Sequence, residues 1–140
     1  MRDMMQAKVG IIRTKEELEQ AVEDLKAFKA RAEACFPGSD RRYNSGWHQA
    51  LDLINMADVS MAATLAALTR EESRGGHTRE DFPTPEDDHW GQHLNIIWME
   101  DGEVRVRQER IEPIRQDLVV VLDEVKAMIK ARAEEQGGGR

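Results

Sequence analysis

The spacing of apolar residues predicts two helices at the start of the chain. Residues 2–9 are expected to form a short helix that ends near Gly10. Thr14 and Glu17 then fit a capping box, in which the threonine oxygen accepts the amide of the residue three positions later. The apolar residues that follow recur at spacings of three and four, as on one face of a helix: Leu18, Val22, Leu25, Phe28 and Ala32. This second helix should end near Cys35, before the breaker run FPGSD at 36–40.

A third, unusually long helix is predicted from Asn44 or Ser45 to about Ser73, and it carries two apolar stripes. One stripe is large (Trp47, Leu51, Ile54, Met61, Leu65, Leu68), and the other is mostly small (Ala50, Leu53, Ala57, Ser60, Thr64, Ala67). We expect Leu51, Ile54 and Leu65 to line the core between the second and third helices. The small stripe suits close approach to a neighbour. If that neighbour is a partner domain, the isolated chain should form a homodimer through the small stripe.

Asp58 interrupts the large stripe. Two interpretations are open: a solvated gap between packed layers, or an ion pair with an arginine. We favour the solvated gap.

A β-hairpin is predicted over residues 93–108, because Asp101-Gly102 is the typical two-residue type I′ turn. This register pairs Met99 with Val104 and Ile97 with Val106 on a face that we expect to be dry. It pairs Trp98 with Arg105 and Ile96 with Arg107 on an amphipathic face, where a cation–π contact can form. A last amphipathic helix follows at 117–135, with Leu118, Leu122, Val125 and Ile129 expected to point inward. Residues 137–140 form a frayed tail.

These elements predict a mainly α fold: a helical bundle with a three-helix, spectrin-repeat-like core, a small β-hairpin and a C-terminal helix. A chain of 140 residues fits one domain over 1–140. The net charge of −7 argues against nucleic acid as a partner, since phosphate binding needs a basic surface. Uninterrupted apolar runs are short, so no direct membrane insertion is expected. The single Cys35 excludes an internal disulfide and fits a reducing, cytoplasmic compartment.

The charged loop, residues 74–92, is the main candidate for chemistry. His89 and His93 are four residues apart, and Asp81, Asp87 and Asp88 are close in sequence, so these residues are candidates for a divalent-metal site. The prolines and glycine of the segment disfavour a shared helical face, and we predict no metal. Cys35 at a helix end is a poor nucleophile. The chain carries no nucleophile elbow, dinucleotide fingerprint or Walker loop, and we predict no catalytic residue.

The run MRDMMQAKVGIIRTKEELEQAVEDL resembles the start of the C-terminal domain of succinate dehydrogenase and fumarate reductase flavoprotein subunits, where a short helix is followed by an arginine and a helix of this type. The resemblance strengthens over residues 53–83, whose end follows the family pattern R-x-E-S-R-G-[AG]-H-x-R-x-D-x-P. The matching positions are Arg70, Glu72, Ser73, Arg74, Gly75, His77, Arg79, Asp81 and Pro83. Trp90 and His93 fit a further D-x-x-W-x-x-H-x-L segment. The resemblance covers residues 1–110, and L-aspartate oxidases resemble the loop as well.

This resemblance implies a helical scaffold and docking domain that is not catalytic on its own. FAD, the substrate-binding residues and the proton-donating arginine belong to flavin-binding and capping domains outside these 140 residues, so the chain is expected to bind no cofactor. The implied partners are those domains and an iron–sulfur subunit, at the inner face of a membrane. The intact parent is implied to be an FAD-dependent enzyme that interconverts succinate and fumarate. The alternatives are the equivalent domain of an L-aspartate-oxidase-like flavoenzyme and a free-standing helical interaction or adaptor protein.

For the loop itself we expect a charge-assisted network of Arg74, His77, Arg79 and Asp81. Arg74 follows the long helix, where a cation is favoured by the helix dipole. His77 can hold a backbone carbonyl. We expect these charges to be exposed, to add little stability and to act in docking.

Overall fold

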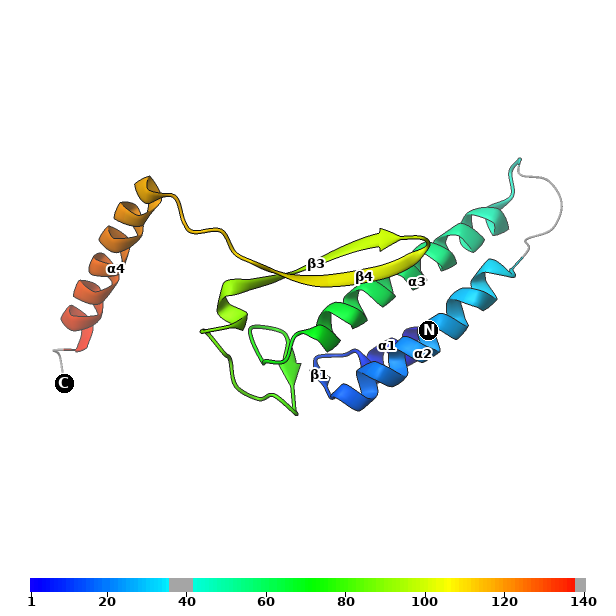
Figure 1. Cartoon of the computed structure of the whole chain (residues 1–140), viewed down its shortest axis with the longest axis horizontal. Helices are drawn as coiled ribbons and strands as arrows, with labels where there is room; N and C mark the ends of the chain where they lie inside the picture. Colours follow the sequence, from blue (N-terminus) through cyan, green and yellow to red (C-terminus); the bar gives the residue numbers. More distant parts are fainter. Residues whose placement is uncertain (36–41, 138–140) are drawn as a thin grey trace. The chain divides into compact units, whose positions relative to one another are not determined.

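The computed structural model describes residues 1–35 and 42–137, which belong to two compact units, Met1–Arg110 and Ile111–Arg140. The prediction from the sequence was one domain over residues 1–140. The first unit contains α1 (Arg2–Lys8), β1 (Ile12–Arg13), α2 (Lys15–Glu33), α3 (Ser45–Thr69), β2 (Thr78–Arg79), the 3-10 helix η1 (Trp90–Gln92), β3 (His93–Glu100) and β4 (Glu103–Arg110). The second contains α4 (Gln116–Gly137). The predicted mainly α fold with one small hairpin is confirmed (Figure 1).

Side-chain caps begin α2 and α3 where the sequence predicted them. The Glu17 amide donates to Thr14 Oγ1 at 3.3 Å, and the Thr14 hydroxyl donates to the Glu17 carboxylate at 3.1 Å. Asn44 Oδ1 accepts the amides of Gly46 and Trp47 at the start of α3. The predicted breaker at 36–40 lies outside the described residues.

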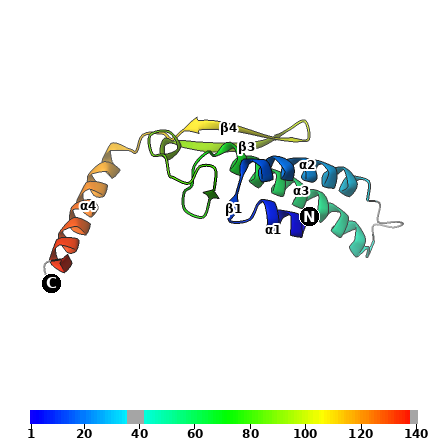
Figure 2. The same cartoon turned by 90° about the horizontal axis from the view of Figure 1, so that it is seen from below.

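Helices α2 and α3 run side by side (Figures 1 and 2), and they meet through small residues. On α3 the buried residues are Ala50, Ala57, Thr64 and Ala67, and on α2 they are Leu18, Ala21, Leu25 and Ala32. The prediction that Leu51, Ile54 and Leu65 line this interface was therefore wrong: Leu51 is 41% exposed, and the other two are only half-buried. Alanine at the contact lets the two backbones approach closely, so the leucines of α2 fill the space. This burial also removes the small stripe as a dimer surface.

Helix α3 is long and apolar enough to cross a membrane, by length and composition alone. Polar residues interrupt the apolar residues of this helix, so no long apolar run in the sequence marks this property. Within the first unit, α3 packs against α2 and against both strands of the hairpin. These contacts cover only part of the apolar surface of α3, since Leu51, Met56 and Val59 remain exposed.

The hairpin has the predicted register, with Met99 opposite Val104 and Trp98 opposite Arg105. Asp101 and Gly102 have φ of 52° and 79°, as a type I′ turn requires. The cation–π contact joins Trp98 to the diagonal residue Arg107, at 5.7 Å. The strands continue to Arg110, two residues beyond the predicted end.

The face that we expected to be dry is only partly covered. Ile97 and Met99 are 40% and 49% exposed, while Val104 and Val106 opposite them are half-buried. Helix α3 packs mainly against β4, so the residues of β3 on this face are left more exposed than their partners on β4.

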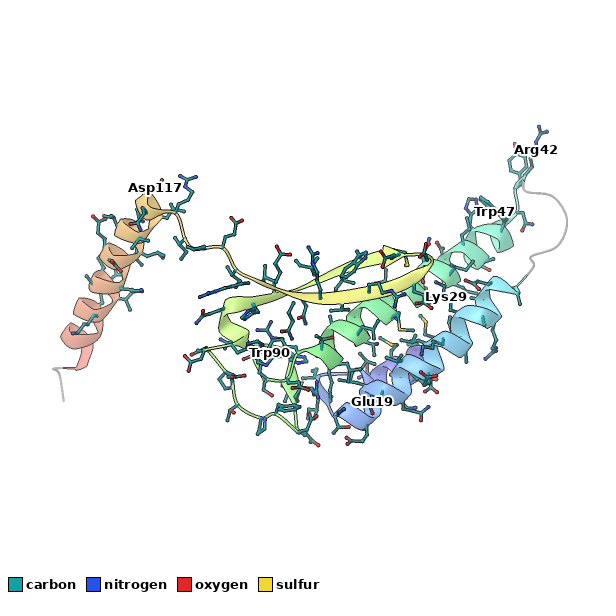
Figure 3. All side chains as sticks on the ribbon, viewed as in Figure 1. Glu19, Lys29, Arg42, Trp47, Trp90 and Asp117 are labelled. Carbon is teal, nitrogen blue, oxygen red and sulfur yellow. The ribbon has the colours of Figure 1, made fainter. Side chains whose placement is uncertain are left out.

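Lys29 joins three elements of the first unit. Its Nζ lies 2.7 Å from Oδ1 of Asp58 on α3 and donates to the carbonyl of Gly102 in the hairpin turn at 2.8 Å. Figure 3 labels Lys29 at the place where α2 approaches the hairpin. The favoured interpretation of Asp58, a solvated gap, was therefore wrong: Asp58 is ion-paired, but with a lysine of α2 rather than with an arginine. A lysine four turns into α2 gave no sequence signal that it would face α3.

In the second unit, the residues of α4 that were predicted to point inward are exposed. Leu118, Leu122, Val125 and Ile129 have 40–63% of their surface exposed. The expectation that they point inward is wrong for this unit, because its described residues, 111–137, form no second helix or sheet against which α4 could pack. The predicted frayed tail at 137–140 falls mostly outside the described residues.

Candidate functional site: the charged loop after α3

Arg79 is fully buried and caps the C-terminal end of α3. Its Nη1 donates to the carbonyls of Ala67, Leu68 and Arg70 at 3.0–3.1 Å. These carbonyls belong to the last turn of a helix and its cap, where intrahelical partners run out. The other edge of the guanidinium forms a two-bond pair with Asp81, at 2.8 and 2.6 Å, which lowers the pKa of that carboxyl. One side chain therefore closes α3 and fixes the turn that follows.

Ser73 holds the two ends of this turn together. Its Oγ accepts the amide of Arg79 at 2.8 Å and lies within hydrogen-bond distance of the carbonyls of Arg79 and Phe82. The Arg79 guanidinium also lies over the Phe82 ring, at 5.1 Å. Pro83, which follows, is exposed.

Glu72 is a second buried charged residue of this region, and two arginines donate hydrogen bonds to its carboxylate. It accepts from both Nε and Nη2 of Arg70, with Nε at 2.8 Å, and from Nε and Nη2 of Arg74 at 2.9 and 3.1 Å. It also accepts the backbone amide of Glu86 at 2.8 Å. The Arg74 hydrogen bonds outweigh burial and lower the pKa of Glu72 to about 2. Glu72 is therefore ionised at neutral pH although the residue is inaccessible to solvent.

Arg74 extends this cluster outward, because its Nη2 also donates to Asp87 at 2.6 Å. The two carboxylates raise the pKa of Arg74. Its backbone pairs in both directions with His77, across a turn in which Gly75 has φ of +60°. That value lies in the left-handed region, where glycine is the residue without steric cost.

His77 links the loop to the N-terminal segment. Arg13 Nη1 lies 2.6 Å from its Nδ1, and its Nε2 lies 3.2 Å from the carbonyl of Arg70. The backbones meet as well: β1 pairs in parallel with β2, and the Glu80 amide donates to the Arg13 carbonyl at 3.0 Å. Burial, followed by the charges of Arg13, Arg79 and Arg70, lowers the pKa of His77.

Trp90 and His93 close the far end of the loop. Trp90, labelled in Figure 3, is 5% exposed, its carbonyl accepts from Arg70 at 3.0 Å, and its ring lies 5.6 Å from the Arg70 guanidinium. His93 Nδ1 approaches the His89 carbonyl at 2.6 Å, and the two rings stack at 4.4 Å. Over residues 1–35 and 42–137, no three histidine, cysteine or acidic side chains are grouped as a metal site would need.

The predicted network of Arg74, His77, Arg79 and Asp81 is thus divided between two centres, Glu72 and Arg79. The predicted exposure of Arg79 was wrong, and Arg79 rather than Arg74 caps the helix. Helix α3 ends at Thr69, four residues earlier than predicted, because the carbonyls of its last turn bond to Arg79. Arg13 was missed as a contact of the loop, although an arginine after the short helix was part of the resemblance.

Residues 1–132 match the family described as fumarate reductase flavoprotein C-term. The chain belongs to this family. The fumarate reductase flavoprotein subunit of Mycobacterium tuberculosis (strain H37Rv) is 36% identical over 107 residues, 76% of this chain and 18% of that protein. The succinate dehydrogenase flavoprotein subunit of Coxiella burnetii is 31% identical over 114 residues, 81% of this chain and 19% of that protein.

The fold agrees with that of a solved relative. The structure of Mycobacterium smegmatis Sdh1 in complex with UQ1 matches with a TM-score of 0.75 and 36% identity, over 86% of this chain and 21% of that chain. The chain therefore spans 18–21% of the length of these relatives.

Proposed function

We propose that residues 1–140 serve as a scaffold and docking domain of a flavoprotein subunit that interconverts succinate and fumarate. The observation that supports this proposal is that charged side chains of the loop bond to other groups of the same chain. Glu72 and Arg79 are buried and bonded to neighbours within the chain. Side chains held in this way maintain a shape rather than perform proton transfer. Membership of the C-terminal family supports the same role.

The surface of the first unit fits a domain that contacts others. Several large apolar side chains on α3 and the hairpin are exposed: Leu51, Met56, Val59, Leu94, Ile97, Trp98 and Met99. Apolar surface of this kind is typical of interaction sites. We infer that it docks on the flavin-binding and capping domains of the parent, which hold FAD. An iron–sulfur subunit and a cytoplasmic position at the inner face of a membrane belong to the same proposal.

A segment exchange tests the role directly. The matching 107-residue segment of the Mycobacterium tuberculosis fumarate reductase flavoprotein subunit is replaced by this chain, and FAD content and fumarate reduction by a reduced dye are measured. The controls are the unaltered subunit and a version that lacks the segment. The proposal expects flavin retention well above the truncated version. A soluble hybrid with no more flavin than the truncated version would overturn it.

The same exchange into an L-aspartate oxidase separates the first alternative. Flavin retention in that hybrid alone would favour the aspartate-oxidase-like parent. Failure in both hybrids, with a chain that folds, would favour a free-standing interaction protein.

A further inference from the structure

The contact between Arg13 and His77 depends on the protonation state of the imidazole. An arginine has only N–H donors, so Arg13 Nη1, 2.6 Å away, must donate to a lone pair on Nδ1. The proton of the neutral ring is then on Nε2, which faces the Arg70 carbonyl at 3.2 Å. Both ring nitrogens are occupied, and both contacts are made at once only by the neutral tautomer with its proton on Nε2.

The charges around this ring are all of one sign. Arg13 belongs to β1, Arg79 belongs to β2, and Arg70 directly follows α3. The nearby carboxylates are bonded elsewhere, Glu72 to Arg70 and Arg74 and Asp81 to Arg79. A proton on Nδ1 would therefore remove the Arg13 hydrogen bond and add a fourth positive charge to the group.

We propose that His77 is a proton-sensitive latch, which holds the segment from Gly10 to Arg13 against the charged loop only while its ring is neutral. The segment has little else to hold it there. Strands β1 and β2 are only two residues long. The Nε atom of Arg13 donates to the Gly10 carbonyl at 2.6 Å, so this bond stays within the segment and does not reach the loop. Ile11 and Ile12 are 74% and 57% exposed, so apolar burial contributes little to the contact. Acidification opens this edge of the domain while α2 and α3 stay packed.

Hydrogen exchange on the full chain at pH 7.5 and 5.5, corrected for intrinsic rates, tests the latch. The reporter is the Glu80 amide, which donates to the Arg13 carbonyl. In the pH range where the open state binds one more proton than the closed state, the equilibrium constant for opening increases by up to about tenfold for each unit by which the pH falls. We expect Glu80 protection to fall between the two pH values, and amides in the middle of α2 to keep theirs.

Two variants complete the test. His77→Gln, which is neutral at both pH values, should remove the pH dependence of Glu80 exchange. His48→Gln, at an exposed histidine of α3, should keep it. If His77→Gln does not fold, an NMR titration of the His77 ring in the natural chain replaces it, and the ring and the Glu80 protection should titrate together. Equal Glu80 protection at both pH values, or a pH dependence that survives in His77→Gln, overturns the latch.

Discussion

The Nη1 atom of Arg79 lies 3.0 Å from the carbonyl oxygen of Ala67, so a side chain of β2 completes the last turn of α3. Arg79→Ala should lower the free energy of unfolding by about 3–5 kcal/mol, since it leaves Asp81 and three helix carbonyls without their partner. Arg79→Lys should lose less, because a lysine keeps the charge but cannot form the fork. Urea denaturation of this chain measures both.

Arg105→Ala is the matched control for Arg79, because Arg105 is half-exposed on the hairpin. It should change stability by less than about 1 kcal/mol. Equal effects at Arg79 and Arg105 would show that the cap of α3 contributes nothing beyond an ordinary surface charge.

Glu72 should control acid stability. Its folded-state pKa is about 2, below the ordinary value of 4.5, so its ionised form adds stability that is fully present above pH 4.5. That stability is lost as the pH falls from 4.5 towards 2. Glu72→Gln should be less stable at pH 7 and should lose less further stability on acidification through this window. Glu71→Gln, at an exposed neighbouring residue, should follow the natural chain, and melting curves from pH 7 to 2.5 compare the three.

The small-residue contact between α2 and α3 should resist enlargement. Ala57 is 1% exposed, so Ala57→Leu should cost about 1–3 kcal/mol or more through overpacking. Leu51→Ala, at 41% exposure on the other stripe, should cost less than about 1 kcal/mol. The reverse order of these two effects would restore the large stripe as the core of the interface.

Lys29 and Asp58 should be energetically coupled. Their side chains are about three-quarters buried, so screening is weaker than at the surface. A double-mutant cycle with Lys29→Met and Asp58→Asn should give a coupling of about 1 kcal/mol. The same cycle on Lys26 and Glu23, a pair exposed by more than 60%, should give a smaller value that salt removes. A zero coupling at Lys29 would mean that the two groups are independent.

Local signals in the sequence predicted the fold well where the cause was local. Thr14 and Asn44 cap helices through atoms two or three residues away, and Asp101-Gly102 forms its turn without help from the rest of the chain. The helix stripes were also correct as patterns. Their assignment to neighbours failed, because periodicity places residues on a face and does not say which face meets which partner.

The loop shows the same limit more sharply. The motif pointed to residues that the structure brings into contact, but charge alone suggested a solvated loop. The burial of Arg79 and Glu72 depends on carbonyls at the end of α3 and on the Glu86 amide, none of which has a side-chain signature. The Arg13–His77 contact joins residues 64 apart in the sequence and could be known only from the fold.

The Lys29–Gly102 hydrogen bond spans 73 residues, whereas the contacts that close the charged loop span 2 to 20. Closing a long segment costs more chain entropy than closing a short one. The loop can therefore assemble on α3 as soon as that helix forms, and the hairpin turn can reach α2 only after most of the first unit is in place. In folding kinetics, substitutions at Arg79 should slow folding, and those at Lys29 should mainly speed unfolding. The arginine that ends α3 is then an early folding contact, and the lysine that joins three elements is a late one.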